Sequence, residues 1–168
     1  ITALTLSGLP TRRFAFEAFL PSEKKERRMV LEELANETRT IVLYEAPHRL
    51  VRTLGELYET LGDRRAALCR ELTKKHETAF RTTIKGLLDF YEKEKPLGEC
   101  VLVIEGKSRL EIQKESQKAW EKMSIEEHME FYESQGNMRK DAMKLVAKDR
   151  GMTKREVYQY LLEREKER

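Results

Sequence analysis

The sequence predicts an α/β domain with a mixed five-stranded sheet flanked by helices, followed by a small all-α extension that resembles a helix-turn-helix. Three observations lead to this prediction. Strand-like apolar runs alternate with amphipathic helical patterns, two strands follow one another around "TKKHE" (73–77), and the composition becomes polar after Gly106. Alternating strands and helices are typical of a sheet covered by helices, and the adjacent strand pair makes that sheet mixed.

The first part of the chain contains two expected strands and three expected helices. "ITALTLSG" (1–8) indicates a short uncapped helix that ends at Gly8, and "RFAFEAFLP" (13–21) alternates as a strand does. Ser22 is expected to cap a helix over 22–37. "RTIVLYEA" (39–46) is a β-branched run typical of a strand covered on both faces, and the leucines of 48–61 predict a helix that stops at Gly62.

Three further strands and one helix complete the predicted domain, which we place at residues 1–106. The strands are expected at "RRAALCREL" (64–72), "TAFRTTI" (78–84) and "GECVLVIEG" (98–106). A short helix, "KGLLDFYEKEK" (85–95), is expected to end before Pro96. We expect the loops at the carboxyl ends of these strands to carry any ligand site.

After the domain, residues 107–123 are expected to form a linker or an exposed helix, and residues 124–168 a helical extension. Ser124 and Glu127 form a Ser-x-x-Glu capping box before an apolar run. Two amphipathic helices follow, and the joint "DRGMT" (149–153) contains a Gly C-cap and a Thr N-cap. Two helices joined by a tight turn that contains glycine predict a helix-turn-helix.

Composition places limits on the setting of the protein. Hydrophobic residues make up 39% and charged residues 38%, and no apolar run is long enough to span a bilayer. We see no secretory signal. Cys69 and Cys100 lie in strand-like runs without further ligands at metal-site spacing, so we expect buried thiols, a cytoplasmic setting and no metal site.

The charge is unevenly distributed, although the net charge is only +3. Residues 138–155 contain seven Lys/Arg and two Asp, which is compatible with a polyanionic partner. The alternative is a small bundle that caps the domain, with a core of Tyr158, Leu161 and Leu162. The sequence alone does not separate these two interpretations.

Three expected strands end in charged clusters, which are "FLPSEKKERR" (19–28), "YEAPHR" (44–49) and "RELTKKHE" (70–77). Each cluster also has a purely structural interpretation. Glu45 and Arg49 are spaced to form a surface ion pair, and Pro47 suits the first turn of a helix, with His48 in solvent. "EKKERR" is equally typical of a solvated helix face.

A resemblance takes the interpretation further. "SGLPTRRFAFEAFLP", "LYEAPHRL", "RELTKKHE" and "GECVLVIEG", in that order, resemble the bacterial 16S ribosomal RNA cytidine 2′-O-methyltransferase family, which belongs to the tetrapyrrole methylase superfamily. Members of that family hold S-adenosylmethionine between two α/β domains and are expected to be homodimers. The resemblance implies that this chain corresponds to the second domain with its helical extension, and that it is inactive without the first.

The resemblance also implies roles for individual residues. The expected cofactor-binding residues are Thr2, Ala3, Tyr44, Glu45, Ala46, Leu72 and Thr73. The candidates for a base that accepts the proton of the ribose hydroxyl are Glu45, His48 and Glu71. Residues expected to contact 16S ribosomal RNA or the small ribosomal subunit are Arg27, Arg28, Arg49, Lys74, Lys140, Lys144, Lys148, Lys154 and Arg155.

Two other functions remain open at this point. One keeps the superfamily and changes the methyl acceptor to a porphyrin or corrin precursor. The other is a non-catalytic nucleic-acid-binding module in which the α/β domain is only a scaffold. The basic extension and the "YEAPHR" motif favour RNA over a tetrapyrrole as the methyl acceptor.

Overall fold

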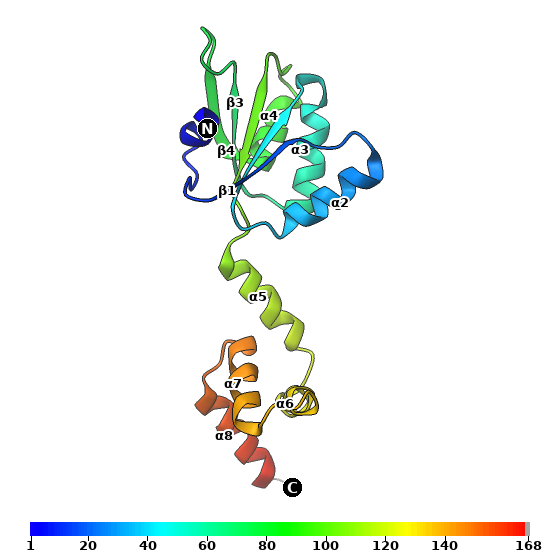
Figure 1. Ribbon diagram of the computed structural model, residues 1–168, viewed down its shortest axis with the longest axis vertical. Coiled ribbons are helices and arrows are strands. Elements are labelled where there is room, and N and C mark those ends of the chain that lie inside the picture. Colours follow the sequence, from blue (N-terminus) through cyan, green and yellow to red (C-terminus); the bar gives the residue numbers. More distant parts are fainter. Residues whose placement is uncertain (167–168) are drawn as a thin grey trace. The chain divides into compact units, whose positions relative to one another are not determined.

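The computed structural model describes residues 1–166 and contains two compact units, which are treated separately below (Figure 1). Unit 1 spans Ile1–Lys107, and unit 2 begins at Ser108. None of the helices in residues 1–166 combines the length and the apolar character that crossing a lipid bilayer requires.

Unit 1 contains a five-stranded sheet in the order β1-β2-β5-β3-β4. β1 and β2 are parallel, whereas β2 with β5, β5 with β3, and β3 with β4 are antiparallel. This arrangement confirms the predicted mixed sheet. The strands are β1 (Phe14–Phe19), β2 (Thr40–Glu45), β3 (Arg65–Arg70), β4 (Thr78–Thr83) and β5 (Cys100–Ile104).

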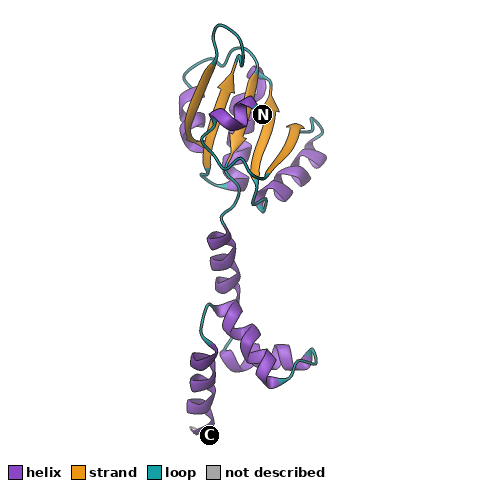
Figure 2. Ribbon diagram, turned by 60° about the vertical axis from the view of Figure 1, so that its left-hand side comes forward, coloured by secondary structure: helices purple, strands orange, loops and turns teal. Residues whose placement is uncertain are grey.

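Helices cover the two faces of this sheet unequally (Figure 2). α2, α3 and α4 supply most of the large apolar core on one face, whereas the short α1 covers only part of the other. The second face therefore keeps an uncovered region over β1 and β2, where Phe16 is 53% exposed. The helices are α1 (Thr2–Leu6), α2 (Lys24–Ala35), α3 (Pro47–Leu61) and α4 (Ile84–Tyr91).

The α3 helix shows why the sequence pattern predicted these elements well. Pro47 occupies its first turn, and Gly62 ends it with φ of +76°. Between them, four leucines spaced three or four residues apart are at most 8% exposed, and burial of each contributes roughly 1.5–3 kcal/mol. These residues are Leu50, Leu54, Leu57 and Leu61.

The start of α2 corrects one prediction. Ser22 was expected to cap this helix, but the cap is Glu23, whose carboxylate accepts a 2.8 Å hydrogen bond from the Glu26 amide. A carboxylate satisfies a free amide of the first turn as a hydroxyl does, and it also has favourable electrostatics with the helix dipole. The backbone hydrogen bond lowers the pKa of Glu23.

Unit 2 consists of helices with a core of its own. The capping box predicted at Ser124 and Glu127 is present, and Gly151 ends α7 in the left-handed conformation. Thr153 and Glu156 form a further capping box at the start of α8, with bonds of 3.2 and 2.6 Å. The helices are α5 (Arg109–Trp120), α6 (Ile125–Ser134), α7 (Arg139–Arg150) and α8 (Lys154–Lys166).

Candidate functional site

Two adjoining hollows lie on the uncovered face of the unit 1 sheet, at the edge where β2 ends and β5 begins. Tyr44, Leu72 and Val101 line both of them, so they form one continuous surface. The first is lined by Ile1, Thr2, Ala3, Leu4, Phe14, Phe16, Val42, Tyr44, Leu72 and Val101. The second is lined by Phe19, Tyr44, Glu45, Ala46, Leu72, Glu99, Cys100 and Val101.

These hollows bring together most of the residues predicted to bind a cofactor. Thr2 and Ala3 line the first hollow, and they belong to α1 rather than to a loop. The other lining residues predicted are Tyr44, Glu45, Ala46 and Leu72. Thr73 lines neither hollow, because it lies in the exposed turn after β3 with φ of +63°. Three segments distant in sequence thus meet at one apolar surface.

Glu45 is held inside the protein by its neighbours. Its side chain is 1% exposed, and Oε1 accepts hydrogen bonds from Nε of Arg49 at 3.0 Å and from the Ala46 amide at 2.8 Å. Oε2 accepts a 2.6 Å bond from the hydroxyl of Thr53. A carboxylate with three donors is well satisfied, so Glu45 is suited to fixing the turn between β2 and α3 and not to accepting a substrate proton.

Arg27 closes this network from the opposite side. It was predicted to contact RNA, but it is 5% exposed, and its Nη2 donates a 2.7 Å bond to Thr53 while lying 4.0 Å from Glu45. Its Nε donates to Glu56 at 2.6 Å. A buried guanidinium must be paired, which these contacts achieve, and it is therefore unavailable to an external phosphate.

Glu56 is an anionic member of the same network. Burial alone would raise the pKa of Glu56, but hydrogen bonds from Arg27 and Arg52 outweigh burial and lower it. Arg52 donates to Glu56 at 2.9 Å, and its side chain is 67% exposed. The network thus runs from the surface at Arg52 through the interior to Arg49 beside the hollows.

Glu71 also has a structural role. Its Oε1 accepts a 2.9 Å bond from the Glu99 amide, and its Oε2 lies 3.5 Å from Nζ of Lys74. The backbone hydrogen bond is the main reason why the pKa of Glu71 is lowered, which keeps it ionised. Gly98, at φ of +77°, leaves room for this carboxylate, since a Cβ there would lie 2.2 Å from Oε1.

The remaining unit 1 candidates are exposed. His48 lies in the first turn of α3. Arg28 pairs with Glu32 at 2.8 Å, and Lys74 pairs with Glu99 at 3.1 Å. Of the three candidate bases, His48 is therefore the one that solvent or a ligand reaches freely.

With this geometry established, comparison with known proteins assigns the family. Residues 1–88 match the family model described as tetrapyrrole (corrin/porphyrin) methylases, which is more than half of the 168 residues. The chain belongs to the tetrapyrrole methylase family. The superfamily predicted from the four motifs is thereby confirmed.

Curated relatives match nearly the whole chain. Two proteins named ribosomal RNA small subunit methyltransferase I cover 94% of this chain: the one from Bacillus subtilis is 44% identical over 158 residues, and the one from Halalkalibacterium halodurans is 41% identical over 158 residues. The match covers 54% of each relative, so this chain spans about half their length. A solved cobalt precorrin-4 methyltransferase is 18% identical, with a TM-score of 0.47 over 61% of this chain and 46% of that one.

Unit 2 presents the predicted cations along α7. Lys140, Lys144 and Lys148 are exposed and four residues apart, so they lie along one side of the helix. Lys144 also pairs with Asp141 at 2.8 Å. At the start of α8, Arg155 is exposed and Lys154 is partly buried. We name the exposed set of Lys140, Lys144, Lys148 and Arg155 the basic stripe.

The same unit corrects one feature of the bundle interpretation. Tyr158 was expected in its core, but it is 52% exposed, whereas Leu161 is 8% exposed. Val157 takes the core position instead, because it lies four residues before Leu161 on the same side of α8.

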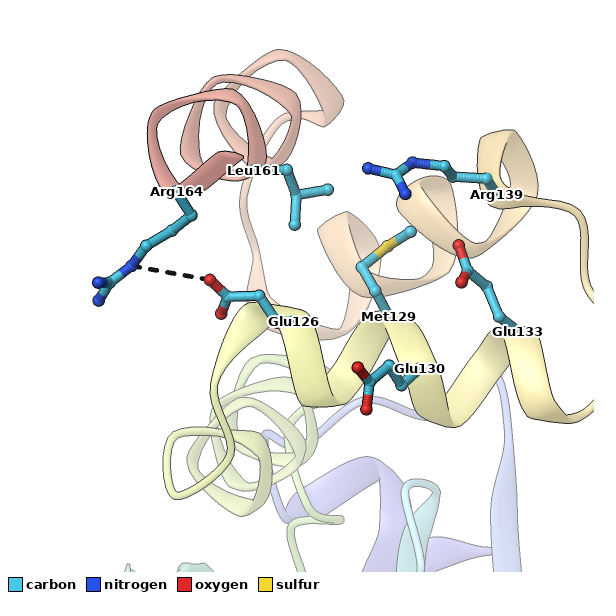
Figure 3. A pocket seen from close by; sticks show the side chains of 7 residues that line it. All are labelled: Glu126, Met129, Glu130, Glu133, Arg139, Leu161 and Arg164. Carbon is cyan, nitrogen blue, oxygen red and sulfur yellow. Dashed lines mark ion pairs between the residues drawn. The ribbon is translucent and has the colours of Figure 1, made fainter. Parts of the chain in front are cut away.

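A groove in unit 2 lies between α6, the start of α7 and α8, and three carboxylates and two guanidinium groups line it (Figure 3). Glu126, Glu130 and Glu133 come from α6, and Glu126 pairs with Arg164 at 3.7 Å. Because carboxylates and guanidinium groups are mixed in its lining, the groove has no excess of positive charge that would attract RNA. Met129, Arg139 and Leu161 complete its lining.

Sequence reasoning missed an exposed aromatic cluster beside the hollows. The ring centroid of Tyr44 lies 5.1 Å from that of Phe16 and 5.6 Å from that of Phe19. The alternation of "FAFEAF" predicted a strand, in which Phe16 and Phe19 would point to opposite faces. Only the backbone irregularity at Ala18 places them on the same face, and no motif in the sequence indicates it.

Proposed function

We propose that this chain is the C-terminal part of an S-adenosylmethionine-dependent methyltransferase that methylates the ribose 2′-oxygen of a cytidine in 16S ribosomal RNA. The observation that supports this most is the coincidence of six predicted cofactor residues around one pair of hollows. Relatives that are 41–44% identical are named ribosomal RNA small subunit methyltransferases, which favours RNA as the acceptor.

The hollows suit the chemistry of S-adenosylmethionine. Their lining is mainly apolar and aromatic, from Phe14, Val42 and Val101 among others, which suits an adenine ring. Tyr44, Glu45 and Ala46, at the end of β2, line the adjoining second hollow. When bound, the cofactor supplies a methyl group that its sulfonium already activates.

This chain's residues then orient the acceptor. Glu45 holds the β2–α3 turn and fixes Arg49, which is placed to bind an RNA phosphate. His48 is the candidate for receiving the ribose proton, because it is exposed beside that turn and an imidazole nitrogen can accept a proton. Alignment of the hydroxyl with the methyl group provides much of the rate enhancement.

We further propose that the half of the relatives outside the matched region supplies the facing wall of the site. The hollows are open on one side, so this chain alone is expected to show no measurable binding of the cofactor and no turnover. A homodimer and a cytoplasmic location, where the small ribosomal subunit resides, are part of the same proposal. The basic stripe provides further phosphate contacts in the complex with RNA.

A tetrapyrrole acceptor is the second candidate, because the family model itself is described by corrin and porphyrin methylases. The basic stripe argues against it, since a small acceptor does not need cations along two helices. A non-catalytic nucleic-acid-binding module would leave the hollows without a role.

The decisive experiment uses a chimera that joins the unmatched half of the Bacillus subtilis relative to this chain. Calorimetric titration should show micromolar S-adenosylmethionine binding by the chimera and none by this chain. The chimera should transfer labelled methyl groups to small ribosomal subunits, with a 2′-O-methylcytidine found on nucleoside analysis. Methylation of a porphyrin precursor but not of subunits would support the second candidate, and absence of cofactor binding by both proteins would favour the non-catalytic module.

A further inference from the structure

We propose that Phe16, Phe19, Tyr44 and Arg49 form a subsite for one unpaired RNA nucleotide, with the aromatic side chains stacking on its base and Arg49 binding its phosphate. We name these residues the nucleotide subsite. The proposal rests on the proposed function, because it specifies how the RNA substrate is held beside the cofactor hollows. Four observations support it: a β-bulge, exposed aromatic rings, an anchored arginine and the position of the hollows.

The first observation is the bulge in β1. The pairing with β2 shifts between Phe16 and Ala18, so that Phe16 pairs with Val42 and Phe19 pairs with Tyr44. Val42 and Tyr44 are two residues apart and share a face of the sheet. The bulge therefore turns Phe19 onto the face of Phe16, which a regular strand would not do.

The bulge is also strained. Ala18 has φ of +50°, a conformation that costs a residue with a Cβ about 1–2 kcal/mol. Strain of this kind is found preferentially where a side chain must be aimed at a ligand. Here its result is an additional exposed aromatic side chain, Phe19.

The second observation is the exposure of the rings. Phe16 and Phe19 are each 53% exposed and Tyr44 is 41% exposed, although the ring of Tyr44 contacts both of the others. A contiguous group of exposed aromatic rings is characteristic of an interaction site. Single-stranded RNA is recognised largely by stacking of its bases on such rings.

The third observation concerns Arg49. Its Nε is bound to Glu45, and its Cζ lies 6.0 Å from the centroid of the Phe19 ring. Within residues 1–166, its two terminal nitrogens have no hydrogen-bond partner. The guanidinium is thus fixed at one edge and free at the other, an arrangement that suits bidentate binding of a phosphate.

Arg49 and the three aromatic rings together indicate which kind of ligand the subsite binds. A phosphate-binding arginine next to stacking rings matches a nucleotide, which carries an anion and a π-face a short distance apart. Tyr44 lines both hollows, Phe16 lines the first and Phe19 lines the second, so a nucleotide held here would place its ribose beside the proposed cofactor site. A purely apolar protein partner would not explain why Arg49 keeps its outer nitrogens free.

Photochemical cross-linking of the whole chain tests the proposal. A short single-stranded oligocytidine that carries one iodinated cytidine is irradiated with the protein, and cross-linked peptides are located by mass spectrometry. The expected result is cross-links at Phe19 or Tyr44, in addition to any along the basic stripe. Cross-links confined to unit 2 would overturn the subsite.

Affinity measurements with matched controls provide the second test. Phe19→Ala and Arg49→Gln should each weaken binding of the oligocytidine about 5- to 100-fold. Phe90→Ala and Arg65→Gln, which change a 43% exposed phenylalanine and a 59% exposed arginine elsewhere in unit 1, should leave it unchanged. Fluorescence anisotropy gives the dissociation constants, and circular dichroism verifies folding.

The outcomes separate this proposal from the proposed function. If the wild-type chain binds the oligocytidine and Phe19→Ala binds it equally well, the subsite is wrong and RNA binding stands. If the wild-type chain does not bind the RNA, the subsite is wrong, and methylation by the chimera decides the proposed function separately. If Phe19→Ala alters only self-association in sedimentation experiments, the aromatic face is a protein interface and the subsite is again wrong.

Discussion

The hydroxyl of Thr53 donates a 2.6 Å hydrogen bond to Oε2 of Glu45, and the two residues are 1% and 3% exposed. The same hydroxyl accepts a 2.7 Å bond from Nη2 of Arg27. Thr53 therefore links a buried anion to a buried cation that lies 4.0 Å from it. The β2–α3 turn, and with it Arg49, depends on this one hydroxyl for part of its support.

Thr53→Val removes the hydroxyl while keeping the shape of the side chain. Because it leaves a buried carboxylate and a buried guanidinium each without one partner, it should lower the free energy of unfolding of unit 1 by about 1–3 kcal/mol. Urea unfolding followed by circular dichroism measures the change. Thr60→Val, on the same helix, loses only a 2.8 Å bond to the Glu56 carbonyl, which already belongs to the helix. If both variants lose equal stability, the linking role of Thr53 is wrong.

Gly106 is required for the close approach of two backbone segments. A Cβ at this position would lie 2.4 Å from backbone atoms of Thr38 and Arg39. Gly106→Ala should therefore destabilise unit 1 by about 1–3 kcal/mol, since the backbone must move to relieve the overlap. Gly55, inside α3, has open space around it, so Gly55→Ala should instead stabilise by about 0.5–1 kcal/mol. Thermal unfolding tests both expectations, because the midpoint temperature should fall for Gly106→Ala and rise for Gly55→Ala.

Helix periodicity and strand composition predicted the elements of unit 1, but they did not predict which charged residues are buried. Arg27 and Arg28 are neighbours in "EKKERR", yet their side chains are 6% and 81% exposed. Arg27 lies four and seven residues before Leu31 and Leu34, on the buried side of α2, whereas Arg28 points to solvent. That spacing indicates that Arg27 is buried, although arginine side chains are usually exposed to solvent.

The site was predictable where it depends on backbone position and unpredictable where it depends on tertiary partners. Tyr44 and Ala46 follow a buried strand, so their place at the carboxyl end of β2 could be inferred. The engagement of Glu45 with Thr53 requires α3 to fold back along β2, and the shared face of Phe16 and Phe19 requires the bulge. Neither contact has a sequence signature.

Unit 2 contains a buried histidine whose protonation should destabilise it. His128 is fully buried, stacks on Trp120 with ring centroids 3.9 Å apart, and accepts a 3.1 Å hydrogen bond at Nδ1 from Nε of Arg150. Burial and the positive charge of Arg150 lower the pKa of His128 below its ordinary value of 6.5, against an opposing effect of Asp149. The unfolded chain therefore binds this proton more readily than the folded one.

The stability of unit 2 should consequently be full above about pH 6.5 and should decrease as the pH falls toward the lowered pKa of His128. Trp120 is the only tryptophan in the chain, so its fluorescence reports the unfolding midpoint of this unit. His128→Phe should be less stable at pH 7, because Nε of Arg150 loses its acceptor, and should show a flatter pH dependence between about pH 7 and 5. The exposed His76 is a control, since His76→Gln should retain the wild-type dependence.

The basic stripe makes a quantitative prediction for RNA binding. Replacing Lys140, Lys144 and Lys148 with glutamine should reduce the slope of log K against log salt concentration by about 2, because each lost phosphate contact with single-stranded RNA removes about 0.7.

A matched control replaces Lys114, Lys118 and Lys122, which are also exposed and lie in or just after α5, with the same change in net charge. Anisotropy titrations of an oligocytidine at several salt concentrations measure both slopes. A general charge effect would lower the two slopes equally, whereas a defined surface on α7 lowers only the first.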